Sequence, residues 1–101
     1  MRPTPVVINF RTAPIDQVKA GAYVGRPSRW GNPFVIGVHG TREEVIVAYG
    51  RYIRGKLDDD PSALRAFEKL AESKYLTCYC APLPCHADVL VEIMRERGLV
   101  E

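Results

Sequence analysis

The chain has 101 residues, of which 47% are hydrophobic and 26% charged, and its formal net charge is +2. This length is typical of a single domain (residues 1–101) whose modest core a homodimer would reinforce, and the composition excludes a disordered chain. The mild net charge by itself gives no support to a nucleic-acid partner.

The first part of the chain predicts short strands separated by turns. Val6–Phe10 is β-branched and aromatic, as strands are, and Ile15–Ala20 follows Pro14 as a short helical turn. Ala22–Gly25 and Phe34–Val38 are two further short strand candidates. The segment between them carries two prolines, two arginines, a glycine and an asparagine, which indicates a loop.

The middle of the chain predicts two helices. Thr41 and Glu44 have the spacing of a capping box, and the helix that they open should end near Gly55. Asp58–Asp60 and Pro61 supply a cap and a first-turn proline for the second helix. The apolar positions at helical spacing are Val45, Tyr49, Tyr52 and Ile53 in the first helix, and Leu64, Phe67, Leu70 and Ala71 in the second.

The last part predicts a strand, a turn and a helix. Tyr75–Cys80 is apolar or aromatic on both faces and should be a central strand. The turn Ala81–Pro84 leads into a helix from about Cys85 to Arg97, which Gly98 ends. Its buried stripe should be Val89, Leu90, Ile93 and Met94.

This order of elements predicts an α/β fold, with a small, partly parallel sheet of three to five strands covered by about three helices. In such sheets, ligands bind beyond the carboxyl ends of the strands. Two segments with unusual side chains, Arg26–Phe34 and Cys78–Asp88, follow or end predicted strands. We therefore expect them to meet at one rim of the sheet and to form one site.

The second of these segments carries reactive side chains. Cys85 lies at or near the N-terminus of the last helix, where the dipole and free amides favour a thiolate or bind an anion. A thiolate beside an imidazole is a plausible nucleophile. We therefore consider Cys85 or Cys80 as the nucleophile, His86 as the acid and base, and Asp88 as the group that orients it.

Two other interpretations of this segment stay open. Cys78, Cys80, Cys85 and His86 are a ligand set that zinc or iron accepts, although adjacent ligands at Cys85 and His86 are an unusual spacing for a structural site. Alternatively, Cys78 and Cys80 are small core residues, and Asp88 only caps a helix. The odd number of closely spaced cysteines argues against disulfides and for a reducing compartment.

The first segment has the ingredients of an anion site. Arg26 and Arg29 can bind phosphate or carboxylate, and Trp30 offers a flat face for a base. In the alternative, Trp30 and Phe34 pack in the core and the arginines are solvated. The candidate ligand-binding residues are Gly25, Arg26, Ser28, Arg29, Trp30 and Asn32.

The N-terminal residues lack an apolar run of signal-peptide length, and no stretch approaches the length that spans a membrane. We therefore expect a cytoplasmic protein that has no membrane partner.

Two motifs carry a resemblance to a known family. The chain has G-R-P-S-x-W-G-N-P-F at Gly25–Phe34 and C-x-C-x-P-x-x-C-H-x-D-V-L at Cys78–Leu90. In this pairing it resembles a bacterial and phage family, domain of unknown function 4326. The resemblance names no reaction, but it implies that the two segments act as one unit.

Our leading hypothesis is a small α/β protein that binds a phosphorylated or nucleotide-like ligand at the rim, as a binding protein or as a Cys/His-dependent hydrolase or transferase. One alternative is a non-catalytic module held together by zinc or iron on Cys78, Cys80, Cys85 and His86. The other is a phage-type module that uses Trp30 and its flanking arginines against a host protein.

Overall fold

A computed structural model describes residues 2–101. Its elements in chain order are β1 (Val6–Asn9), α1 (Ile15–Ala20), β2 (Ala22–Tyr23), α2 (Arg42–Asp59), α3 (Pro61–Leu70), β3 (Tyr75–Cys78) and α4 (His86–Glu96).

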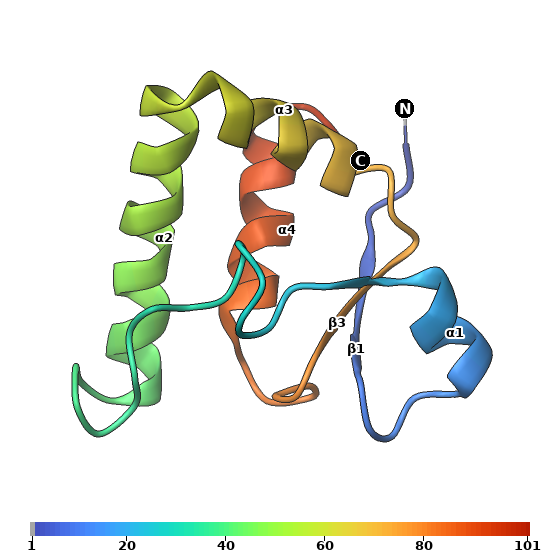
Figure 1. Ribbon diagram of the computed structural model, residues 1–101, viewed down its shortest axis with the longest axis horizontal. Helices are drawn as coiled ribbons and strands as arrows, with labels where there is room; N and C mark the ends of the chain where they lie inside the picture. Colours follow the sequence, from blue (N-terminus) through green and yellow to red (C-terminus); the bar gives the residue numbers. More distant parts are fainter. Residues whose placement is uncertain (1) are drawn as a thin grey trace.

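The strands form one three-stranded sheet in the order β1-β3-β2, and both strand pairs are parallel. Val6 lies opposite Tyr75, and Ala22 lies opposite Leu76. The predicted α/β fold is confirmed, as is the central position of the strand that begins at Tyr75. Because all strands run in one direction, their carboxyl ends lie together, at the bottom of Figure 1.

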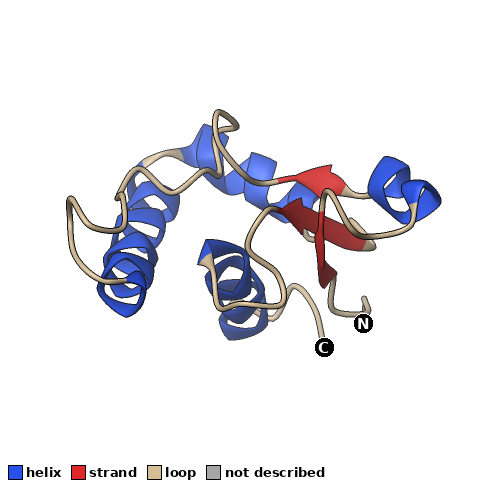
Figure 2. Cartoon of the chain, turned by 90° about the horizontal axis from the view of Figure 1, so that it is seen from below, coloured by secondary structure: helices blue, strands red, loops and turns tan. Residues whose placement is uncertain are grey.

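Helices lie on both sides of this sheet. Figures 1 and 2 show α1 on one side and α4 on the other, and α2 packs beside α4 at the edge of the molecule farthest from α1. Both α2 and α4 begin at the end where the strands finish (Figure 1). The carboxyl ends of the strands and the starts of two helices therefore share one end of the molecule.

The helix starts follow the local sequence signals. The Glu44 amide donates to Thr41 Oγ1 at 3.2 Å, and the Thr41 amide donates to Glu44 Oε1 at 2.9 Å, so the capping box is confirmed. Asp60 Oδ1 accepts from the amides of Ser62 and Ala63 at the start of α3. These bonds satisfy backbone donors that a helix leaves free at its first turn.

The end of α2 differs from the prediction. The helix does not stop near Gly55 but continues to Asp59. Leu57 is only 2% exposed, so one more turn buries another apolar side chain. Burying a leucine contributes about 1.5–3 kcal/mol, which exceeds the cost of about 1 kcal/mol for a glycine inside a helix.

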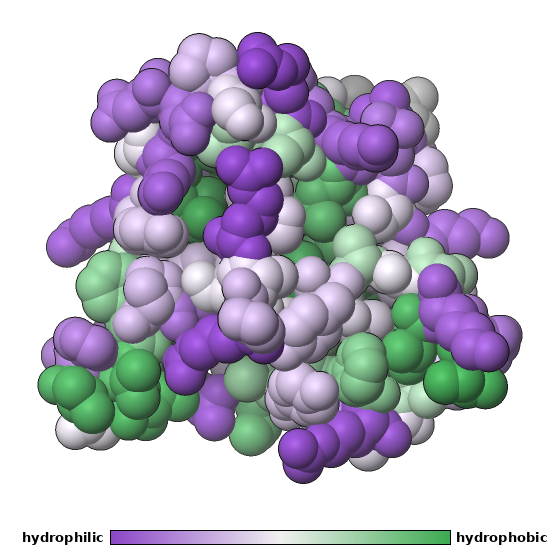
Figure 3. Space-filling view, in the orientation of Figure 1, coloured by the Kyte–Doolittle hydropathy of each residue, from purple (hydrophilic) through white to green (hydrophobic). Residues whose placement is uncertain are grey.

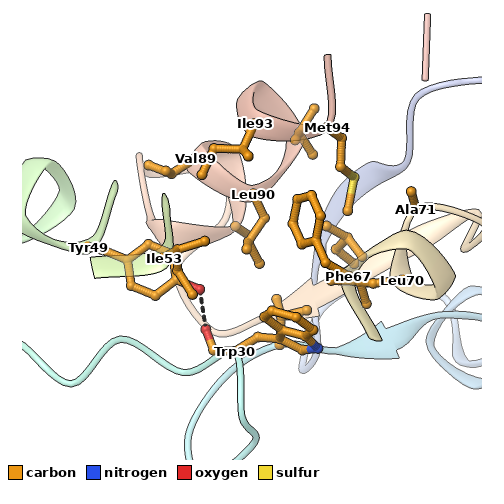
Figure 4. Packing of buried hydrophobic residues seen from close by; sticks show 14 of the residues in the cluster. Trp30, Tyr49, Ile53, Phe67, Leu70, Ala71, Val89, Leu90, Ile93 and Met94 are labelled. Atoms are coloured by element: carbon orange, nitrogen blue, oxygen red, sulfur yellow. Dashed lines mark hydrogen bonds between the residues drawn. The ribbon is translucent and has the colours of Figure 1, made fainter. Parts of the chain in front are cut away.

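The core lies between the sheet, α2, α3 and α4 (Figure 4). Phe67 from α3 and Leu76 from β3 are fully buried in it. All four residues of the predicted stripe on α4 are buried: Val89, Leu90, Ile93 and Met94.

The segment Phe34–Val38 is not a strand. The structure shows there only one isolated bridge, between Ile36 and Gly40, and Gly37 has φ +87°, which turns the chain back on itself. The apolar residues of this segment suit a strand, but no neighbouring strand lies beside them to pair with. The prediction is wrong because pairing depends on the tertiary arrangement.

The two ends of the described chain meet. Thr4 Oγ1 donates to the Glu101 carbonyl at 2.9 Å, and the Glu101 amide donates to the Arg2 carbonyl at 3.0 Å. Figure 1 shows both termini at the end opposite the carboxyl ends of the strands. Among residues 2–101, no helix has the length and apolar character needed to cross a bilayer.

Candidate functional site

A cavity of about 300 Å³ opens where the strands end and α2 and α4 begin. Both segments singled out in the sequence contribute to its walls. The first gives Arg26, Asn32 and Phe34, with Gly25 directly before it, and the second gives Cys80, Pro84, Cys85 and His86. The two segments, which are about fifty positions apart, therefore lie side by side at the rim.

Arg26 is fixed in the wall of the cavity by its own loop. Its Nε donates to the Asn32 carbonyl at 2.9 Å, and Nη2 lies 3.5 Å from the Phe34 carbonyl. Asn32 is itself held, because its Nδ2 donates to the Val45 carbonyl in α2 at 3.2 Å. The remaining N–H groups of Arg26, whose side chain is exposed, are available to a ligand.

The start of the loop requires a glycine. A Cβ on Gly25 would lie 2.5 Å from the hydroxyl oxygen of Tyr23, which donates to the Arg26 carbonyl at 2.6 Å. Any other residue at this position would displace the tyrosine that supports the arginine loop.

Arg42 is a second cation in the wall, and the sequence analysis missed it. It is the first residue of α2, and its Nη1 donates to the Pro84 carbonyl at 3.1 Å, which links α2 to the loop before α4. A signal was present in the sequence. A positive charge in the first turn of a helix is disfavoured by the helix dipole, so a basic residue there calls for another role.

Trp30 does not wall the cavity. Its side chain is 8% exposed and packs in the core against Phe67, with the two ring centroids 5.7 Å apart (Figure 4). The expectation that Trp30 stacks on a ligand or faces a partner protein is therefore wrong. The large indole contributes more by burial in this small core than it would on the surface.

Two other residues of this loop also lie outside the cavity lining. Arg29 is exposed, and its guanidinium carbon is 5.5 Å from the centroid of the Trp30 ring. Ser28 Oγ accepts from the Trp30 amide at 3.3 Å and so shapes the turn. Neither contributes to the cavity, in contrast to the expectation that both bind the ligand there.

His86 is held as a neutral ring. Its Nε2 lies 2.6 Å from the Val24 carbonyl oxygen, and because a carbonyl only accepts, Nε2 carries the proton. Burial lowers the pKa of His86, although the bond to Val24 acts in the opposite direction. In this tautomer the basic lone pair is on Nδ1, and the residue lines the cavity.

Cys85 is a poorer nucleophile than its position predicts. It is the N-cap of α4 but is 3% exposed, and its Sγ lies 3.4 Å from Sγ of Cys78. The hydrogen bond to Cys78, together with burial, raises the pKa of Cys85. The same bond lowers the pKa of Cys78, whose side chain also accepts hydrogen bonds from the backbone amides of Cys80 and Ala81. The helix dipole, which would lower the pKa of Cys85, is therefore outweighed by burial and by the contact with Cys78.

Cys80 is the accessible thiol of the three. It is partly exposed and lines the cavity, as His86 does. Of the two cysteines considered as nucleophiles, the geometry favours Cys80 over Cys85.

Asp88 does not orient His86. Its Oδ2 accepts from the Cys85 amide at 3.0 Å, as the acidic member of a capping interaction at the start of α4. The partner of the His86 ring is the Val24 carbonyl instead. The Cys85 amide, one of the free donors expected for an anion, is thus already used.

The predicted metal ligands do not converge. Among residues 2–101, no group of three or more histidine, cysteine or acidic side chains is placed to hold an ion. Cys78 and Cys85 touch each other, but His86 points its Nε2 at Val24. This arrangement therefore does not support a zinc or iron site with Cys78, Cys80, Cys85 and His86 as its ligands.

The outer wall of the cavity is apolar. Ile36, which lines it, is 49% exposed, and Val38 close by in the same loop is 74% exposed. Figure 3 shows hydrophobic side chains gathered at the lower left, over the loop that leads into α2. No aspartate or glutamate of residues 2–101 lines the cavity, so its charged groups are Arg26 and Arg42.

The comparisons with known proteins agree with the two motifs. The family described as domain of unknown function (DUF4326) matches residues 8–96, a span that includes both segments of the cavity. No curated protein and no solved structure matches the chain. Because the match covers most of its length, the chain belongs to the family of domain of unknown function DUF4326.

Proposed function

We propose that this α/β domain binds a small phosphorylated or nucleotide-like ligand in the cavity at the carboxyl ends of the strands. The observation that carries the proposal is the pair Arg26 and Arg42, which come from different elements and line a cavity without a carboxylate. Guanidinium groups bind phosphate oxygens by charge-assisted hydrogen bonds.

The size and walls of the cavity support the same conclusion. Its volume of about 300 Å³ is at the lower limit of ordinary small-molecule sites. The walls combine apolar side chains, among them Phe34, Val45 and Ile46, with a few polar groups, which is the usual composition of such sites. A ligand with an anionic end and a less polar end fits this division.

The first test is calorimetric titration of the protein with adenosine 5′-monophosphate and with inorganic phosphate. Arg42→Gln should weaken binding of both by roughly tenfold to a hundredfold, because it removes charge-assisted bonds. Arg26→Gln should act in the same direction, although this side chain also supports its own loop.

Arg29→Gln is the matched control. It makes the same change of charge in the same loop, but Arg29 does not line the cavity, so affinity should stay within about twofold. Equal losses in Arg29→Gln and Arg42→Gln would show that binding depends on overall charge and would contradict the site.

A second candidate function is nucleophilic hydrolysis or group transfer on that ligand, and it is favoured by Cys80 and His86 lining the same cavity. Nδ1 of His86 would take the Cys80 proton, and the thiolate would attack the ligand atom that bears the leaving group. A bond forms from Sγ to that atom, giving a covalent intermediate, and the bond from that atom to the leaving group breaks. The leaving group departs with the proton from His86. Water, or a second acceptor in a transferase, then takes the transferred group and restores the thiol.

Alkylation by iodoacetamide, followed by peptide mass spectrometry, tests this second candidate. Cys80 should react well before Cys78 and Cys85, and His86→Gln should slow its reaction at neutral pH if Nδ1 accepts its proton. His39→Gln, which changes the other histidine, is the control. The assignment of Cys80 as nucleophile and His86 as its base would be rejected if Cys85 were labelled first, or if Cys80 were alkylated at the same rate in His86→Gln as in the wild type.

A further inference from the structure

Three aromatic rings, one from the end of each strand, form a cluster beside the cavity. Phe10 follows β1, Tyr23 ends β2 and Tyr79 follows β3. The ring centroids are 5.6 Å apart for Phe10 and Tyr23, 5.4 Å for Phe10 and Tyr79, and 5.9 Å for Tyr23 and Tyr79. We call Phe10, Tyr23 and Tyr79 the aromatic platform.

The platform is not part of the hydrophobic core. Phe10 is 41% exposed and Tyr79 is 48% exposed, whereas core rings such as Phe67 are fully buried. Tyr23 is half-buried. The two exposed rings forgo part of the stabilisation that burial would provide, and an exposed apolar patch beside a cavity is a candidate binding surface.

The platform is continuous with the cavity and carries a cation. Tyr23 and Tyr79 both line the cavity, and Tyr23 supports the loop of Arg26 through its hydroxyl group. The guanidinium carbon of Arg11 lies 4.9 Å from the centroid of the Tyr79 ring. The ring planes are inclined to one another by 55° to 72°, so a base would stack on one ring and meet the edges of the others. Aromatic rings flanked by arginines are the arrangement on which bases stack in proteins that bind single-stranded nucleic acid.

We infer that the aromatic platform receives the planar base of a nucleotide whose phosphate is bound by Arg26 and Arg42. This inference rests on the proposed function and names its ligand class, a nucleoside phosphate. A sugar phosphate would use the arginines alone and would leave the platform bare. Phe10, Tyr79 and the nearby Arg11 complement a π-system, which a nucleobase has and a sugar lacks.

The inference is tested by comparing adenosine 5′-monophosphate with ribose 5-phosphate in calorimetric titrations. The wild-type protein should bind the nucleotide roughly fivefold to a hundredfold more tightly, the range expected for one stacked base. Tyr79→Leu should remove most of that advantage, because it should lower the affinity for the nucleotide far more than the affinity for ribose 5-phosphate. Phe10→Leu serves as a second variant in case Tyr79→Leu does not fold.

Tyr75→Leu is the matched control, because Tyr75 is the tyrosine at the start of β3, the strand that Tyr79 follows. It should leave both affinities as they are. A second readout, independent of affinity, is the proton NMR spectrum of the base, whose signals should move upfield on binding to the wild type and not to Tyr79→Leu.

The failures are distinguishable. If ribose 5-phosphate and the nucleotide bound with equal affinity, and Arg42→Gln still weakened both, base stacking on the aromatic platform would be rejected. The phosphate site of the proposed function would remain supported. No binding of either compound, or of inorganic phosphate, would overturn the proposed function and the platform together.

Discussion

His86 shows how burial sets the charge of a single residue. The residue is 8% exposed, its ring centroid lies 5.1 Å from that of Tyr49, and its Nε2 donates to a backbone carbonyl. A protonated ring would need to lose its hydration in this environment, so burial lowers the pKa of His86 below the value of 6.5 that it has in the unfolded chain.

This shift predicts a loss of stability in acid. At pH values between the folded and the unfolded pKa of His86, the unfolded chain binds more protons than the folded chain. The contribution of His86 to the free energy of unfolding is therefore complete above about pH 6.5 and falls as the pH drops below that value. Urea unfolding between about pH 5 and pH 8 should show this slope in the wild type and a flatter curve in His86→Gln.

The control for this prediction is His39→Gln, which removes the other histidine, so that a change seen only in His86→Gln is assigned to His86. Glu44 and Glu96, whose pKa values are lowered by hydrogen bonds, act below their usual value of 4.5 and so outside this window. An unchanged slope in His86→Gln would mean that another group titrates.

At the same scale, the cysteines show what local rules leave out. The position of Cys85 at a helix N-terminus predicts an acidic thiol, but its Sγ lies 3.4 Å from a sulfur atom seven positions earlier. That contact, with burial, reverses the expected direction. No pattern within the segment reveals that the Sγ atoms of Cys78 and Cys85 would lie close together, or that Cys80 would be the most exposed of the three thiols.

At the scale of elements, the arginine loop has no strand or helix of its own and depends on α2. The Tyr49 hydroxyl donates to the Trp30 carbonyl at 2.6 Å, and both groups are buried (Figure 4). The Asn32 amide adds a second bond to the Val45 carbonyl. These two bonds position the loop that carries Arg26.

We therefore expect Tyr49→Phe to lower the stability of the protein measurably. It leaves the buried Trp30 carbonyl without its donor, which should lower the free energy of unfolding by about 1–3 kcal/mol. Tyr52→Phe, on the same helix and half-buried, should change it by less than about 0.5 kcal/mol. Urea unfolding of both variants measures the difference, and equal losses would contradict the role of this bond.

The elements that the sequence predicts correctly are those whose signals are local. The caps at Thr41 and Asp60 and the stripe along α4 depend on neighbouring residues, and the structure confirms them. Phe34–Val38 fails as a strand because its pairing partner had to come from elsewhere. The end of α2 fails because burial of Leu57 outweighs the glycine signal.

At the scale of the whole molecule, one topological rule predicts more than any residue pattern. Parallel strands align their carboxyl ends, so the segments after β2 and β3 were expected to meet, and they line one cavity. The rule does not say which side chains face inward. Arg42 lines the cavity because α2 packs beside α4, and Trp30 packs in the core instead of in the cavity wall. Both placements depend on long-range contacts.

The pairing of the chain ends has a practical consequence for this molecule. Arg2 and Thr4 are hydrogen-bonded to Glu101 at the end opposite the cavity. A carrier protein or a sensor surface joined through either end would therefore leave the cavity facing outward. Ends this close can also be bridged by a short linker, so the chain is a natural subject for circular permutation, with new ends opened in an exposed loop far from Arg26.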